Sequence, residues 1–138
     1  MTGFKRWLLD RGLAAKRQNL EETGAVTHMC YDFLLFGKAK ALLGGQVRHM
    51  LTGSAPIDKA VLDFLKICFC CPMQEGYGLT ETSASGCLMA AEDTVTAHVG
   101  GPIEIGKMRL MSLPEMNYLV TDQPYPRGEL LMKGLYMF

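Results

Sequence analysis

The segment from Val47 to Tyr77 constrains the fold more than any other, because strand-like and helix-like patterns alternate along it. Val47–Thr52 resembles a short strand, and Pro56 and Asp58 mark the start of a helix for which Asp58 is a suitable N-cap. Four apolar residues of this helix recur at the spacing of one buried face: Val61, Phe64, Leu65 and Cys68. Met73–Tyr77 has the pattern of a second short strand. This order of strand, helix and strand predicts an α/β fold.

Two further helices are expected before this segment. The first covers residues 4–22, is interrupted near Gly12, and carries five basic residues: Lys5, Arg6, Arg11, Lys16 and Arg17. A basic amphipathic helix of this kind either lies on a membrane surface or, more commonly, presents a solvated face. The second helix covers Tyr31–Leu43 and is closed by Gly44-Gly45, where glycine suits a positive φ.

The pattern changes after Pro102 to short strand-like pieces separated by prolines and glycine. These pieces are Ile105–Leu113, Tyr118–Thr121 and Glu129–Lys133. The 138 residues fit one domain by length. We therefore expect an α/β part over residues 1–103, followed by the start of a β-rich part over residues 104–138.

The composition indicates a globular segment, because 49% of the residues are hydrophobic, 20% are charged and the formal net charge is zero. A neutral chain lacks the basic field that binds nucleic-acid phosphates, so nucleic acid is not an expected partner. No apolar stretch approaches the roughly 18 residues that cross a bilayer, so no transmembrane segment is expected. The five cysteines lack metal-site spacing and predict buried thiols in a reducing, intracellular setting. His28, His49 and His98 are expected to be packing or surface residues.

Two patches carry residues suited to ligand binding. In Leu51–Pro56, small residues follow a strand and let a planar ligand approach the backbone, although a tight turn without a ligand would use the same residues. In Gln74–Thr82, glycines flank Tyr77, whose ring can stack on a nucleobase. Thr80 can donate to a phosphate oxygen, and Glu81 can hold Mg²⁺. The alternative for this second patch is a β-turn followed by an acidic helix start.

Four motifs resemble those of the adenylate-forming superfamily, which includes acyl-CoA synthetases, luciferases and peptide-synthetase adenylation domains. Tyr-Gly-Leu-Thr-Glu-Thr at residues 77–82 resembles its core motif, and Thr-Gly-Ser-Ala-Pro at residues 52–56 is similar to its preceding motif. Val-Gly-Gly-Pro at 99–102 and Arg-Gly-Glu-Leu at 127–130 follow in the order that the superfamily shows. Residues 114–118 and 124–129 resemble the long-chain fatty acyl-CoA synthetases, especially fungal and related eukaryotic forms.

The resemblance implies that the chain is a fragment of the large N-terminal domain of an adenylate-forming enzyme. Its parent reaction activates a fatty acid with ATP to acyl-AMP and then transfers the acyl group to CoA. The implied cofactor-binding residues are Gly53, Ser54, Ala55, Pro56, Glu75, Gly76, Tyr77, Gly78 and Thr80. The implied catalytic residues are Thr80, at the α-phosphate, and Glu81, at the magnesium ion, while Gly100 and Gly101 would shape the acyl pocket.

The same resemblance implies ATP, Mg²⁺ and the co-substrate CoA as ligands, and a fatty acid as substrate. It also implies peripheral membrane contact of the full-length protein at the endoplasmic reticulum, peroxisome or lipid droplet. Neither a phosphate loop ending in Pro-Lys-Gly nor the ribose and lysine motifs of the superfamily occur in this sequence. We therefore expect the isolated chain to be inactive. The alternatives are a non-catalytic truncated product that binds nucleotide or a partner, or a ligase for a shorter or aryl acid.

Overall fold

A β–α–β crossover forms the centre of the chain. In the computed structural model, which describes residues 3–104, 106–135 and 137–138, β1 (Met50–Thr52) and β2 (Met73–Tyr77) are parallel and are connected by α4 (Lys59–Phe69). Met50 lies opposite Met73 in the register. The sheet continues with antiparallel β3 (Cys87–Leu88) and β4 (Gly101–Pro102), in the order β1-β2-β3-β4. The predicted α/β fold is confirmed.

The helix α4 begins as predicted but buries a different face. The Asp58 carboxylate accepts hydrogen bonds from the backbone N–H groups of Ala60 and Val61, at 2.8 and 3.2 Å. The buried residues of α4 are Leu62, Lys66 and Ile67, whereas Val61 and Phe64 are 48% and 43% exposed. The predicted face is therefore wrong, because α4 is apolar on two sides and only the Leu62 side packs against α1, α3 and β2.

The first helix, α1 (Gly3–Thr23), runs without the interruption predicted near Gly12. A Cβ at Gly12 would lie 2.9 Å from the Leu35 Cδ1 atom, so the missing side chain allows the next helical segment to approach closely. That segment comprises α2 (Met29–Tyr31), a π-helical turn η1 (Asp32–Phe36) and α3 (Gly37–Leu42). Gly44 and Gly45 follow it at positive φ, as predicted.

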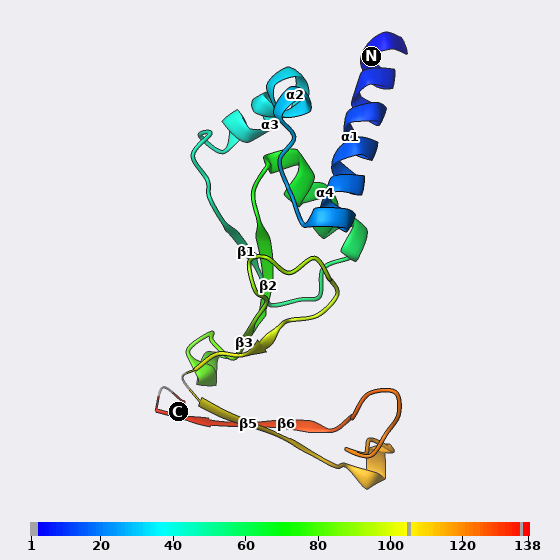
Figure 1. Ribbon diagram of the computed structural model, residues 1–138. Coiled ribbons are helices and arrows are strands. Elements are labelled where there is room, and N and C mark those ends of the chain that lie inside the picture. Colours follow the sequence, from blue (N-terminus) through cyan, green and yellow to red (C-terminus); the bar gives the residue numbers. More distant parts are fainter. Residues whose placement is uncertain (1–2, 105, 136) are drawn as a thin grey trace.

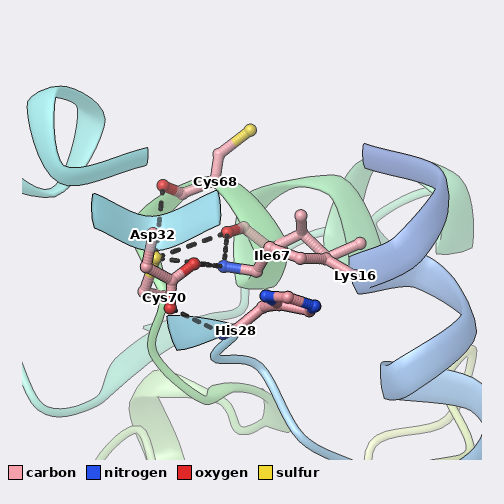
Figure 2. A network of polar contacts seen from close by, with 6 residues as sticks. All are labelled: Lys16, His28, Asp32, Ile67, Cys68 and Cys70. Atoms are coloured by element: carbon pink, nitrogen blue, oxygen red, sulfur yellow. Dashed lines mark hydrogen bonds and ion pairs between the residues drawn. The ribbon is translucent and has the colours of Figure 1, made fainter. Parts of the chain in front are cut away.

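Lys16 is buried in the core between these helices, not on the solvated or membrane-facing side that the basic pattern predicts. The core cluster contains Leu20, Phe36, Ile67 and Cys70. The Lys16 ammonium forms an ion pair with Asp32 and donates to the Ile67 carbonyl at 2.8 Å and to the Cys70 Sγ atom at 3.1 Å (Figure 2). It also lies 4.7 Å from the centre of the Phe36 ring. An ammonium has three N–H donors, so three acceptors use all of them.

The five cysteines form no disulfide, and only two of them are buried as predicted. Cys70 and Cys71 are buried, whereas Cys30 is exposed. Burial raises the pKa of the Cys70 thiol, and the neighbouring Lys16 ammonium opposes part of that rise. Cys70 is therefore a protonated core residue at neutral pH.

The C-terminal part is a β-hairpin at the opposite end of the molecule from the helices (Figure 1). Its strands, β5 (Gly106–Met111) and β6 (Glu129–Gly134), pair antiparallel, and a 3₁₀ turn η3 (Pro114–Met116) follows β5. Residue 105, where the predicted strand begins, lies outside the described residues. The predicted strand at Tyr118–Thr121 is reduced to one isolated bridge between Leu113 and Tyr118. None of the described helices has both the length and the apolar character that a membrane span requires.

Candidate functional site

A cavity of about 350 Å³ lies where the parallel strands β1 and β2 end. The carboxyl ends of parallel strands in an α/β sheet are the usual place for ligands. The wall of the cavity is contributed by the end of β1, the end of β2, the segment before β3, and β3 itself. The lining residues are Leu51, Thr52, Gly53, Ser54, Gly76, Gly78, Ala84, Ser85, Cys87, Leu88 and Ile103.

Four of the predicted cofactor-binding residues meet in this cavity: Gly53, Ser54, Gly76 and Gly78. Ser54 has φ of +69°, and Ala55 and Pro56 beside it are exposed and do not line the cavity. A Cβ at Gly78 would lie 2.3 Å from the carbonyl oxygen of Ala84, so the backbone can run this way only with glycine. The absence of side chains at the three glycines, Gly53, Gly76 and Gly78, leaves backbone groups facing the cavity.

Glu75 lies on β2 next to the lining residue Gly76 and is only 4% exposed. Its Oε1 atom accepts a hydrogen bond from the backbone N–H of Ile57 at 3.3 Å, which connects the turn after β1 to β2. Side chains alternate along a strand, so Tyr77 lies on the same face of β2 as Glu75 and on the opposite face from Gly76. Neither Glu75 nor Tyr77 lines the cavity, and their contact with adenine stays a prediction.

Thr80 and Glu81 are exposed on a 3₁₀ turn, η2 (Thr80–Thr82), outside the cavity. Buried Thr82 holds this turn, because its Oγ1 atom accepts from the Leu79 N–H at 2.9 Å. Glu81 lines a separate hollow of about 220 Å³, with Leu79, Thr82, Leu130, Met132, Met137 and Phe138. The Glu81 carbonyl accepts from the Phe138 N–H at 3.1 Å, which ties η2 to the end of the chain.

The chemistry of Glu81 fits the predicted magnesium ion. Among the described residues, no cluster of three or more His, Cys, Asp or Glu side chains could hold a metal. Magnesium does not need one, because it binds through one or two carboxylates and completes its shell with phosphate oxygens and water. A single exposed carboxylate such as that of Glu81 meets this requirement.

The two glycines predicted for the acyl pocket lie behind the cavity wall. Gly101 begins β4 and pairs with Leu88, a lining residue. Gly100 has φ of +74°, and a Cβ there would lie 2.0 Å from the Leu88 carbonyl oxygen. A Cβ at Gly101 would meet no atom within 4 Å, so the space beside it is open.

Sequence patterns alone do not indicate several residues of this site. Cys87, Leu88 and Ile103 line the cavity through the pairing of β3 with its neighbours, and their own residue types carry no signal. His98, which the sequence predicts to be a packing or surface residue, is half-buried, and its Nδ1 atom accepts from the Gly100 N–H at 3.0 Å. A side-chain acceptor two residues before a glycine was the signal available for this contact.

Comparisons with known proteins agree with this geometry. Residues 7–138 match the family model of the AMP-binding enzyme. The chain is 42% identical over 135 residues to fatty acyl-CoA synthetase A of Dictyostelium discoideum, covering 98% of this chain and 20% of that protein. It is 42% identical over 134 residues to the peroxisomal long chain acyl-CoA synthetase 7 of Arabidopsis thaliana, covering 97% and 19%. It is 39% identical over 139 residues to human long-chain-fatty-acid–CoA ligase 1, covering 99% and 19%. The chain thus spans about a fifth of the length of these relatives.

A solved structure shows the same fold. The A domain of carboxylic acid reductase from Segniliparus rugosus, in complex with AMP and a carboxylic acid, aligns with a TM-score of 0.57 and 27% identity. The alignment covers 91% of this chain and 19% of that one. The named relatives come from a slime mould, a plant and human, so the predicted fungal likeness stays a prediction. The chain belongs to the AMP-binding enzyme family, and its relatives in that family are long-chain acyl-CoA synthetases.

Proposed function

We propose that this chain supplies the nucleotide-facing and magnesium-facing part of an ATP-dependent long-chain fatty acid–CoA ligase. The cavity carries the proposal, because four residues of the two patches Leu51–Pro56 and Gln74–Thr82 meet in it at the carboxyl ends of parallel strands: Gly53, Ser54, Gly76 and Gly78. The proposed reaction is taken from the family that residues 7–138 match and from the names of the relatives.

In the proposed first step, a fatty-acid carboxylate oxygen attacks the α-phosphorus of ATP. The bond to pyrophosphate breaks, and acyl-AMP forms. The Thr80 hydroxyl would donate a hydrogen bond to an α-phosphate oxygen. Glu81 would hold magnesium, which neutralises negative charge on the phosphates when it is bound. The cavity would take the adenine part of the nucleotide, and Glu75 would fix the turn after β1. Tyr77 lies outside the cavity lining, so its stacking on the base rests on the family resemblance alone.

In the second step, the CoA sulfur attacks the acyl carbonyl carbon, AMP leaves with the electron pair of the broken bond, and acyl-CoA forms. The role of this chain in that step would be the pocket wall beside Gly100 and Gly101, where one side is open. Two relatives, both from Arabidopsis thaliana, are named as peroxisomal. Their names support an intracellular location at the peroxisome in preference to the endoplasmic reticulum or lipid droplets. Peripheral membrane contact belongs to this proposal for the longer protein.

A chimera tests the proposal. Residues 7–138 replace the matching segment of the Dictyostelium relative, which is 42% identical, and fatty-acid-dependent ATP–pyrophosphate exchange is measured. We expect exchange in the chimera and its loss, by a factor on the order of 100 or more, in a Glu81→Gln variant. Glu92→Gln is the matched control, because Glu92 is also an exposed glutamate and lies outside both hollows. A folded chimera without exchange, or equal rates in the two variants, contradicts the proposal.

A second candidate is nucleotide binding without turnover, which is favoured because all the lining residues of the cavity in the described part of the chain lie between residues 51 and 103. Calorimetric titration of the 138-residue chain with AMP separates the two. Binding by the chain together with an inactive chimera supports the second candidate. Comparing palmitate, octanoate and benzoate in an active chimera decides between a long-chain, a shorter-chain and an aryl acid.

A further inference from the structure

Both ring nitrogens of His98 have partners. The Nδ1 atom accepts a hydrogen bond from the backbone N–H of Gly100 at 3.0 Å, and the Nε2 atom lies 3.3 Å from the Oδ2 atom of Asp93. A nitrogen that accepts an N–H carries no proton itself. The hydrogen bond from Gly100 therefore requires an unprotonated Nδ1, and the proton of the neutral ring is then on Nε2, which lies near the Asp93 carboxylate.

The Gly100 amide is a point where small displacements matter. Gly100 has φ of +74°, and its backbone packs so closely on Leu88 that a Cβ would lie 2.0 Å from the Leu88 carbonyl oxygen. Leu88 pairs with Gly101 and lines the cavity at the ends of β1 and β2. The hydrogen bond from Gly100 to His98 thus fixes the entry of the chain into β4, directly behind the cavity wall.

Charged groups of α4 surround the same segment. Lys59 donates to the Thr96 hydroxyl at 3.0 Å and pairs with Asp63. Burial lowers the pKa of Lys66, and the charges of Asp63 and Asp93 oppose part of that lowering. Asp93 thus interacts with a cation on α4 as well as with His98, and Glu92 of the same segment is exposed. Of these groups, Asp93 lies against the imidazole itself, and Lys59 and Lys66 interact with the segment that carries it.

We propose that His98 is a proton-sensitive positioning residue, which holds the Gly100-Gly101 wall in place only while its Nδ1 atom is unprotonated. Protonation turns Nδ1 from an acceptor into a donor, so the Gly100 N–H loses its partner while the contact of Nε2 with Asp93 persists. The wall is then released from the segment that carries His98. The structural part of this inference stands alone, and its bearing on fatty-acid binding rests on the proposed function.

Nuclear magnetic resonance on the 138-residue chain tests the structural part. At about pH 8, long-range ¹H–¹⁵N spectra should place the His98 proton on Nε2, and the Gly100 amide should exchange slowly with solvent. Lowering the pH to about 5 should reduce the protection of that amide roughly five- to tenfold beyond the intrinsic pH effect on exchange. A proton found on Nδ1 at about pH 8 overturns the inference.

Two substitutions separate positioning from simple packing. Asn places an amide oxygen near the position of Nδ1, so His98→Asn should keep the protection and remove its pH dependence. Gln reaches only toward the Nε2 position, so His98→Gln should lose the protection at both pH values. Equal losses in the two variants overturn the inference, and exposed His49→Asn should change nothing. If circular dichroism shows that His98→Gln is unfolded, the inference is still tested by the protection in His98→Asn and by the position of the ring proton in the parent chain.

The active chimera then tests the functional part. The KM for fatty acid should rise between about pH 8 and pH 5 in the parent chimera and stay flat in His98→Asn. An inactive chimera refutes the proposed function and leaves the resonance results untouched. An active chimera whose KM profile is the same with and without His98 limits the role of His98 to structure and overturns the functional part.

Discussion

The Nζ atom of Lys16 lies 2.8 Å from the carbonyl oxygen of Ile67, so a fully buried ammonium on α1 donates to the last turns of α4. The same ammonium pairs with Asp32 (Figure 2), and the Asp32 side chain is 22% exposed. Lys16→Met should lower the free energy of unfolding by about 3 kcal/mol, because Asp32 and the Ile67 carbonyl lose their partner. Urea unfolding followed by circular dichroism measures this change.

The control for Lys16 is Lys38→Met, at an exposed position, which should change stability by less than about 0.5 kcal/mol. The double variant Lys16→Met with Asp32→Asn should be more stable than Lys16→Met alone, because it removes the uncompensated carboxylate. A loss below about 1 kcal/mol for Lys16→Met would show that water replaces the ion pair without penalty.

Lys66 is the contrasting case, since burial lowers its pKa more than the charges of Asp63 and Asp93 raise it. A lysine whose charge is disfavoured by its surroundings contributes little to stability at neutral pH. Lys66→Met should therefore leave the free energy of unfolding unchanged or raise it by up to about 1 kcal/mol in the same urea experiment. A loss as large as that of Lys16→Met would mean that Lys66 has a stabilising partner.

The two apolar faces of α4 should respond differently to truncation. Ile67 is 1% exposed in the core cluster, so Ile67→Ala should lower stability by about 2–5 kcal/mol through the cavity that it leaves. Val61 is 48% exposed on the opposite face, and Val61→Ala should change stability by less than about 0.5 kcal/mol. Equal effects in the 138-residue chain would mean that a second molecule covers the Val61 face, and a concentration series would show it.

Gly78 and Gly101 form a matched pair for the cavity. Gly78→Ala brings a Cβ to 2.3 Å from the Ala84 carbonyl, so the turn must move, at a cost of about 1–3 kcal/mol, and AMP binding should be lost. Gly101→Ala meets no atom within 4 Å and should keep both stability and AMP binding. Thermal melting with and without AMP measures both quantities. Unchanged AMP binding in Gly78→Ala would exclude this cavity as the nucleotide site.

Local patterns of the sequence predicted the elements whose causes are themselves local. Asp58 caps α4, and Gly44-Gly45 end the second helical segment, because capping and positive φ depend on a few neighbouring residues. The burial of Lys16 could not be predicted, because its partners Asp32 and Ile67 are distant in the sequence. The uninterrupted α1 at Gly12 has the same explanation, since Leu35 packs into the space that glycine leaves.

The candidate site shows the same division between local and distant causes. The two motifs at residues 52–56 and 77–82 carry Gly53, Ser54 and Gly78, and the structure brings these residues to one cavity. That Glu81 faces a different hollow depends on the position of Phe138, which no local pattern encodes. The partners of His98 likewise follow from the path of the chain into β4.

The parallel register of β1 and β2 sets the order of events during folding. Met50 and Met73 can pair only after the chain has turned back through the whole of α4. The entropy cost of closing this loop therefore comes before the strand pairing that stabilises it. An isolated helix forms within about a microsecond, far sooner than such a pairing. The transition state should therefore contain α4 packed against the core cluster around Ile67. Refolding in a stopped-flow instrument should be slowed by Ile67→Ala and be nearly indifferent to truncation of Leu131 in the distant hairpin.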